Sequence, residues 1–137
     1  MSQLLEQAKN FHGHIGPFLI LGLKAGLEVV KIAGKDPLNS FVEVRLPLQR
    51  PYTCFVDGVQ LCTGCTLGKM NIKLVNTLDE SILMTYVCNG KRVCLKVKDE
   101  ILKFLILKLK NRYNMNKLAK EIWALPSSEL FEISLFI

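Results

Sequence analysis

The sequence has few of the features that mark a disordered, fibrous or membrane-spanning chain. Its 137 residues include only 9 Gly and 5 Pro without a short repeat, which excludes a collagen-like or low-complexity chain. Half of the residues are hydrophobic and 22% are charged, which excludes a disordered chain. The longest apolar stretch, 15–23, is interrupted by Gly16, Pro17 and Gly22, and a membrane span needs about 20 apolar residues. We therefore expect one domain over 1–137 with a buried core.

The sequence also lacks a secretory signal. Its first ten residues, MSQLLEQAKN, have no basic region followed by an apolar one, so we expect a cytoplasmic protein. The five cysteines are an odd number, and thiols stay reduced in that compartment. We therefore expect free cysteines rather than a disulfide framework.

Acidic residues are scarce in one part of the chain. Residues 91–120 contain ten basic residues and only Asp99 and Glu100 as acids, a net charge of +8 in a chain whose total is +6. Such a segment can attract an anionic ligand, RNA or an acidic protein. We interpret it as a solvated face and expect neither a membrane nor a nucleic acid as partner.

Proline and glycine mark the bounds of a long helix over 17–33, with Pro17 in its first turn and Gly34 at its end. Gly22 and Gly26 lie four apart on one face, where together they destabilise the helix by about 1–2 kcal/mol. Close packing against another backbone would offset this loss. Further helices are expected at 3–10, 53–61, 99–110 and 116–124, and strands at 41–46, 71–75 and 131–137.

The clearest local signal is Asn89-Gly90, the preferred dipeptide of a type I′ turn, which predicts a hairpin over 81–97. A two-residue turn fixes the register and places Tyr86 opposite Val93. The strands are mixed with helices but do not alternate strictly with them. This pattern predicts an α+β fold with a mainly antiparallel sheet packed with helices.

Both histidines of the chain stand in the block Phe11-His12-Gly13-His14, shortly before the helix that starts at Pro17. Imidazole is the commonest metal ligand and the usual proton shuttle. A glycine turn can bring together two side chains that a regular helix would separate, and a helix N-terminus favours an anion. The block is therefore a candidate functional site.

A second block holds Cys54, Cys62 and Cys65, together with Asp57 and Lys69. Cys62 and Cys65 form a CxxC motif, which can hold zinc or carry out thiol–disulfide chemistry. A second CxxC is absent, which excludes a zinc ribbon within this chain. The motif also falls at the expected end of a helix, whereas a thioredoxin-type motif stands at a helix start.

Two catalytic motifs are absent. The stretch 64–69 is no P-loop, because three residues rather than four separate its glycines and Met70 follows the lysine. No Gly-x-Ser-x-Gly motif is present, so a hydrolase triad has little support. Histidines and cysteines that meet in space would instead suit zinc or another borderline-soft metal.

At these two blocks the sequence resembles the FmdE family, whose members are related to a subunit of formylmethanofuran dehydrogenase. The family block Phe-His-Gly-His-x-Cys-Pro-Gly-Leu corresponds to residues 11–19. The family block that ends Thr-Gly-Cys-Thr-Leu-Gly-Lys-Gly-Asn-Leu corresponds to residues 54–72. Residues 122–133 also match the end of the family's core domain, so the resemblance spans nearly the whole chain.

The resemblance implies an α+β core domain, a homodimer, and a metal or active site built from the two blocks. It implies other subunits of formylmethanofuran dehydrogenase as partners, and those subunits, not this chain, hold the molybdopterin. We expect a transition metal, with zinc as the leading candidate, and we rank His14 and Cys65 first as its ligands and His12 and Cys54 second. Around them, Asp57 would orient a histidine, Cys62 would supply a further thiol and Lys69 would face an anionic ligand.

One position departs from the family pattern, because the cysteine of the first family block is Gly16 here. A thiol at a helix N-terminus favours the thiolate, so the change removes a ligand or a reactive group. We therefore do not expect catalysis by this chain alone, and Cys62, which lies outside the pattern, is a candidate replacement. Many members also carry a C-terminal zinc finger, whereas this sequence ends at Ile137.

Three hypotheses follow for the function. The first is a metal-binding protein accessory to C1 and redox metabolism, namely carbon dioxide reduction to formylmethanofuran. The second is a non-catalytic interaction subunit with a degenerate metal site. The third is a thiol redox protein that uses Cys62 and Cys65.

Overall fold

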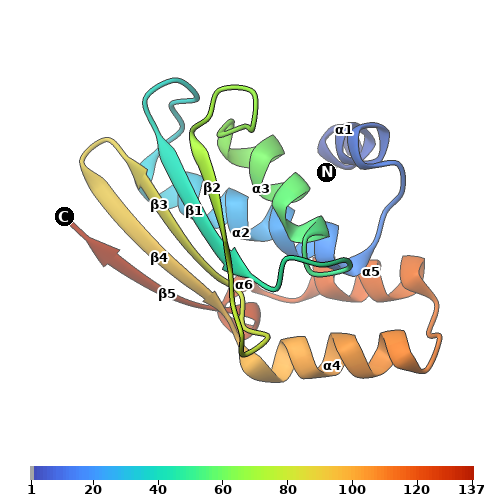
Figure 1. Cartoon of the computed structure of the whole chain (residues 1–137). Helices are drawn as coiled ribbons and strands as arrows, with labels where there is room; N and C mark the ends of the chain where they lie inside the picture. Colours follow the sequence, from blue (N-terminus) through green and yellow to red (C-terminus); the bar gives the residue numbers. More distant parts are fainter. Residues whose placement is uncertain (1) are drawn as a thin grey trace.

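A computed structural model describes residues 2–137, which form one five-stranded sheet and six helices (Figure 1). The helices are α1 (Ser2–His12), α2 (Pro17–Ala33), α3 (Cys54–Thr63), α4 (Asp99–Lys110), α5 (Met115–Ala124) and α6 (Ser127–Leu130). The strands are β1 (Phe41–Leu46), β2 (Ile72–Asn76), β3 (Leu83–Cys88), β4 (Lys91–Val97) and β5 (Phe131–Phe136). Apart from the short α6, each element was expected from the sequence. Within residues 2–137, no helix is both long and apolar enough to cross a membrane.

The sheet is mixed, which corrects the expectation of a mainly antiparallel sheet. Its strand order is β2-β1-β3-β4-β5, and β1 pairs with β2 in parallel while the other neighbours are antiparallel. The reason is that α3 lies between β1 and β2 in the chain. A helical crossover of this kind returns the chain in the same direction, whereas a tight turn would reverse it. The parallel strand β2 thereby becomes an edge of the sheet, beside α3.

The β3–β4 hairpin has the expected register. Tyr86 lies opposite Val93 and Met84 lies opposite Leu95, and all four side chains are buried. Asn89 and Gly90 both have positive φ angles, as a type I′ turn requires. The hairpin therefore presents one apolar face to the core.

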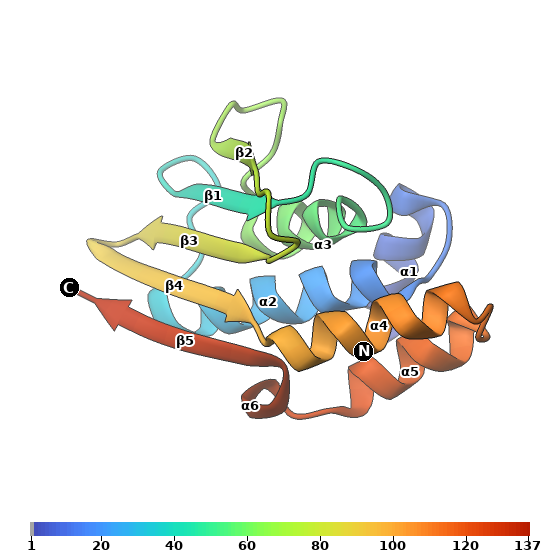
Figure 2. The ribbon, with the colours of Figure 1, turned by 60° about the horizontal axis from the view of Figure 1, so that its bottom comes forward.

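Helices α2 and α3 cover the inner face of the sheet, and α5 packs on α2 (Figure 2). Helix α4 continues from the end of β4, and α5 runs back beside it. Lys24 of α2 ties this hairpin of helices to the core, because its ammonium group donates to the carbonyls of Ile122, Trp123 and Leu125 at the end of α5. A cation there also complements the helix dipole. Burial lowers the pKa of Lys24, and Glu28 opposes this effect.

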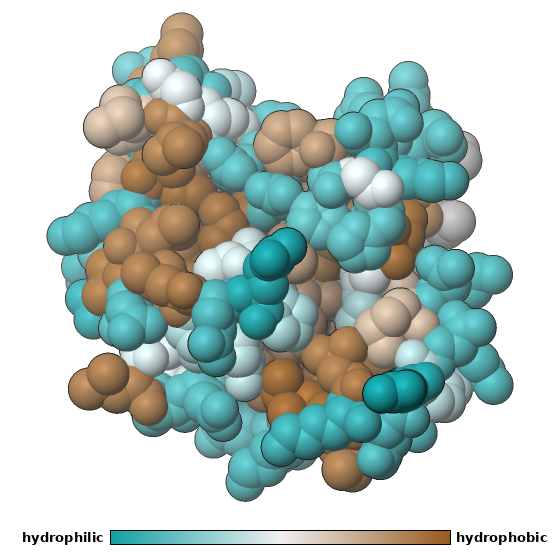
Figure 3. All heavy atoms as spheres, turned by 45° about the vertical axis from the view of Figure 1, so that its right-hand side comes forward, coloured by the Kyte–Doolittle hydropathy of each residue, from teal (hydrophilic) through white to brown (hydrophobic). Residues whose placement is uncertain are grey.

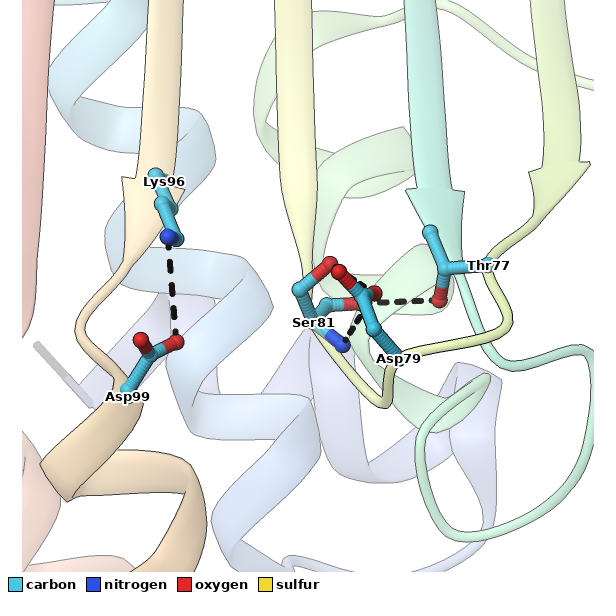
Figure 4. A network of polar contacts seen from close by, with 5 residues as sticks. All are labelled: Thr77, Asp79, Ser81, Lys96 and Asp99. Carbon is cyan, nitrogen blue, oxygen red and sulfur yellow. Dashed lines mark hydrogen bonds and ion pairs between the residues drawn. The ribbon is translucent and has the colours of Figure 1, made fainter.

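Polar side chains organise the connections at one end of the sheet (Figure 4). Asp79 accepts hydrogen bonds from the hydroxyl and the backbone N–H of Ser81, at 2.7 and 3.3 Å, and these bonds lower the pKa of Asp79. Thr77 donates to the carbonyl of Ser81 at 3.1 Å. Lys96 Nζ lies 3.8 Å from Asp99 Oδ1, at the point where β4 ends and α4 begins. These contacts order the β2–β3 connection and the start of α4.

The backbones of α2 and α3 touch at glycines. A Cβ atom on Gly22 would overlap the carbonyl of Phe55, and one on Gly58 would overlap the backbone of Gly22 and Leu23. On the next turn, a Cβ atom on Gly26 would lie 2.6 Å from the Cβ atom of Cys62. The glycine stripe expected to pack closely against another backbone therefore does so, and its partner is α3.

This contact leads to a prediction that opposes helix propensity. Propensity alone would make the change Gly22→Ala stabilising by about 1 kcal/mol. We expect it to destabilise the protein by about 3 kcal/mol, because a methyl group forced into a packed interface must push the helices apart. Urea unfolding curves measure the difference. The control is Gly68→Ala, which has nothing within 4 Å of its Cβ position and should change stability by less than about 0.5 kcal/mol. Equal stability of the two variants would contradict the packing described here.

Candidate metal centre

The centre of the candidate site is a hydrogen bond between the last residue of α1 and the first turn of α3. His12 Nδ1 lies 2.6 Å from Asp57 Oδ2. The His12 side chain is 10% exposed, and among residues 2–137 its Nε2 atom is buried without a hydrogen-bond partner. A carboxylate on Nδ1 favours the tautomer that carries its proton there, and Nε2 then keeps a free lone pair. Such a nitrogen is ready to bind a metal ion or to accept a proton.

The second histidine lies beside the first. The rings of His12 and His14 have their centroids 4.8 Å apart and are tilted by 37°. Both rings line a small pocket of about 170 Å³, and Cys54 and Gly16 lie in its wall. Residues from the end of α4 and the start of α5 close the other side of this pocket. The histidine block and the first cysteine of the second block therefore line one pocket at the start of α2.

Gly16 is the N-cap of α2, with φ −139° and ψ 169°, an extended conformation that any residue can adopt. A Cβ atom built on it would lie 3.5 Å from His14 Nε2 and 3.7 Å from Cδ2, which is ordinary van der Waals contact. The backbone therefore has room for a cysteine side chain next to His14. Its thiol would belong to the same pocket as the two histidines.

Cys54, the first residue of α3, is the thiol that lies nearest to this chemistry in the fold. It is partly buried and lines the same pocket as His12 and His14. Burial raises the pKa of the Cys54 thiol, the negative charge of Asp57 raises it further, and Arg50 opposes both effects. The two larger effects therefore favour the protonated form of this thiol.

Cys65 is not brought to the histidines. Cys54 begins α3 and Cys65 follows its end, so a ten-residue helix, about 15 Å long at 1.5 Å per residue, lies between them. Cys65 is fully buried, and its sulfur lies 3.2 Å from the hydroxyl of Ser40. The structure therefore places Cys65 in the core, beside a residue that precedes β1.

Cys62 is also turned away from the histidines. Its thiol donates to the carbonyl of Leu23 at 3.3 Å, and its Cβ atom faces Gly26 in the contact between α2 and α3. Burial raises the pKa of Cys62 to about 11, although Lys35 opposes this shift. The two thiols of the CxxC motif thus point to different partners, an arrangement that gives thiol–disulfide chemistry no support.

The segment 64–71, which follows α3, is a loop held by side-chain hydrogen bonds. The Thr63 hydroxyl accepts from the N–H of Cys65 at 3.1 Å, and Asn71 Oδ1 accepts from the N–H of Thr66 at 2.9 Å. Lys69 is exposed, and its ammonium group donates to the Thr66 hydroxyl at 3.0 Å. Lys69 does not line the pocket that holds His12 and His14. The Thr-Gly-Cys-Thr-Leu-Gly-Lys block therefore acts first as a structural loop.

Sequence reasoning missed the connection between this loop and Asp57. Gln60 Nε2 lies 3.4 Å from Asp57 Oδ1, and Gln60 Oε1 accepts from the N–H of Leu67 at 3.0 Å. The signal was present, because Gln60 follows Asp57 by three residues and therefore shares its face of α3. Arg50, which lies near Cys54, carried no comparable signal because it stands in an irregular segment.

The fit of these residues to a metal ion is partial. Two imidazoles and one thiol line the pocket, which suits zinc or a similar ion. Across residues 2–137, however, no three His, Cys, Asp or Glu side chains are already grouped so as to hold a metal ion. The residue that would have completed the group in the family pattern is Gly16.

These features define an α+β protein with a paired histidine site at the start of a buried helix. The chain belongs to the FmdE family, described as "FmdE, Molybdenum formylmethanofuran dehydrogenase operon", whose sequence pattern matches residues 11–132. The expected resemblance is thus confirmed over most of the chain.

Proteins that are similar to this chain include one of known structure and one known from its sequence. A crystal structure of a tungsten formylmethanofuran dehydrogenase FmdE-like protein from Syntrophus aciditrophicus matches with a TM-score of 0.63. The match covers 98% of this chain and 71% of that one, and at 21% identity it supports the fold alone. A probable S-adenosyl-L-methionine-binding protein from Archaeoglobus fulgidus is 39% identical over 74 residues, which are 53% of this chain and 20% of that protein. The chain therefore spans only about a fifth of that relative.

The burial of the thiols predicts their order of reactivity. With iodoacetamide at pH 8, we expect Cys54 and Cys94, which are partly exposed, to be alkylated at least tenfold faster than Cys62, Cys65 and Cys88, which are buried. Timed mass spectrometry of peptides measures each rate. Rapid modification of Cys62 and Cys65 together would contradict their placement and would revive the thiol redox hypothesis.

Proposed function

We propose that this chain is a metal-binding accessory protein of the formylmethanofuran dehydrogenase system, which holds one transition metal ion, zinc first, at His12 and His14. The observation that carries the proposal is the buried Nε2 atom of His12, which has no hydrogen-bond partner within residues 2–137 and whose ring Asp57 orients through Nδ1. A buried polar atom without a partner is destabilising unless something binds it. A metal ion satisfies that atom.

The donor set supports this choice of ion. His12, His14 and Cys54 line one pocket, and zinc binds imidazole nitrogen and thiolate sulfur. Zinc would supply a Lewis acid whose remaining positions stay open to water or a ligand. In the protein, Asp57 holds His12 in place, and the glycine contact between α2 and α3 holds Asp57.

The first prediction concerns zinc affinity. We expect His12→Ala to abolish stoichiometric zinc binding, and Asp57→Asn to weaken it about 10–100-fold because it removes the group that orients the imidazole. Elemental analysis and a competitive chelator titration measure both. Cys65→Ser is the matched control, and it should leave zinc affinity unchanged. Loss of zinc in Cys65→Ser but not in His12→Ala would assign the site to Cys65 and overturn the proposal.

A second prediction uses the departure at position 16. Gly16→Cys adds a thiol beside His14 without backbone strain, so it should raise zinc affinity at least about tenfold, because it adds a strong ligand. Gly16→Ser is the control of similar size and should raise it much less. An unchanged affinity in Gly16→Cys would mean that His14 does not face the metal.

A second candidate function is favoured by helix α4. This helix exposes Phe104 and Leu107, which are 37% and 57% exposed, next to Lys103 and Lys110. A basic helix with exposed apolar side chains is suited to an acidic partner protein. Another subunit of formylmethanofuran dehydrogenase is the partner that the family suggests. Co-expression followed by co-purification of the two subunits tests this role. Leu107→Asp should dissociate a complex that the wild-type protein forms. A complex that survives this change would contradict the role of α4.

A further inference from the structure

A second, larger pocket shares its polar end with the metal site. This groove has a volume of about 590 Å³ and lies between α3 and the edge strand β2. Its lining includes His12 and Cys54, which also line the small pocket, so these two residues separate the two spaces. Pockets of about 300–1,000 Å³ are typical of small-molecule sites.

The side of the groove away from the histidines is apolar. Val56 of α3 is buried, whereas Leu74 and Leu67 are 41% and 70% exposed. With Ile72 they form an apolar wall that is partly exposed. Figure 3, which brings forward the face with α1 and α3, shows apolar side chains gathered in patches among hydrophilic ones. Covering such a wall with the apolar part of a ligand is favourable by about 25 cal/mol per Å².

The polar end of the groove carries a free cation. Arg50 lines it and is exposed, and none of the ion pairs found in residues 2–137 involves Arg50. A guanidinium group in this position can bind a carboxylate or sulfonate through two hydrogen bonds.

Polar contacts that connect Leu67, Gln60 and Asp57 to His12 also hold the groove in shape. Gln60 contacts Asp57 with its amide nitrogen and holds the N–H of Leu67 with its oxygen. Asp57 in turn holds His12, whose side chain is nine-tenths buried and whose Nε2 atom has no partner within residues 2–137. The apolar rim at Leu67 is therefore linked to His12 by a continuous chain of polar contacts.

We infer that this groove binds an organic anion with an apolar body. The apolar part lies on Leu67, Ile72 and Leu74, the anionic group pairs with Arg50, and the inner end of the ligand faces His12. The inference goes beyond the proposed metal site, because these contacts need no metal ion. It can therefore succeed or fail independently of zinc binding.

Two dyes of nearly the same shape test it in buffer with EDTA. One is 8-anilinonaphthalene-1-sulfonate, which is an apolar anion, and the other is N-phenyl-1-naphthylamine, which lacks the sulfonate. Fluorescence titrations give the two dissociation constants. Arg50→Gln should weaken the sulfonate dye about tenfold and leave the neutral dye within about twofold, because only the anion pairs with the arginine. Leu74→Asp should weaken both dyes about tenfold, because it removes apolar wall.

Two matched controls test whether the changes in dye affinity arise in the groove. Arg45→Gln removes the same charge from an arginine paired with Glu43, and Leu78→Asp changes a leucine that is 97% exposed outside the groove. Neither control should alter either dissociation constant by more than about twofold. Absence of dye binding to the wild-type protein, equal effects of Arg45→Gln and Arg50→Gln, or equal loss of both dyes in Arg50→Gln would overturn the assignment.

Discussion

The contact between α2 and α3 at Gly22 and Gly58 determines where the candidate site lies. Because neither glycine has a side chain, the two backbones touch, and the starts of both helices are fixed relative to each other. Asp57 stands one residue before Gly58, so the same contact sets Asp57 against His12 at 2.6 Å. Helix α2 begins shortly after the His12–His14 block, so the spacing of α2 and α3 also bears on the distance between that block and Asp57. The close packing of α2 and α3 in the core thus positions Asp57 beside His12 at the edge of the core.

Much of the fold follows from local signals. Asn89-Gly90 requires positive φ angles, so the hairpin and its register were predictable, and Pro17 and Gly34 bounded α2 correctly. The parallel pairing of β1 and β2 was not predictable in the same way. It depends on the crossover through α3, and no turn residue in the sequence indicates that crossover. Local chemistry therefore identified the elements, whereas long-range packing decided how the sheet is assembled.

The site was predictable in part, for a similar reason. Residues His12, His14, Cys54 and Asp57 stand at or near helix ends that the fold brings together. Cys65 stands in the same sequence block as Cys54, but one helix length separates them in space. Arg50 gains a role only through its neighbours in the folded chain, whereas the spacing of Gln60 from Asp57 on α3 was a usable signal. The sequence therefore indicated which kinds of side chain the candidate site contains, but it did not indicate reliably which of those side chains lie together.

The departure at Gly16 leaves a pocket with two imidazoles and a thiol, of which His12 is the best prepared to bind. The proposed metal binding depends above all on the lone pair of His12 Nε2, which is buried and has no partner within residues 2–137. Anomalous X-ray diffraction from crystals soaked with zinc tests its availability most directly. We expect an anomalous peak about 2.1 Å from His12 Nε2, the usual length of a zinc–histidine bond. A peak at Cys65, or none near His12 at saturating zinc, would contradict a metal site at this histidine.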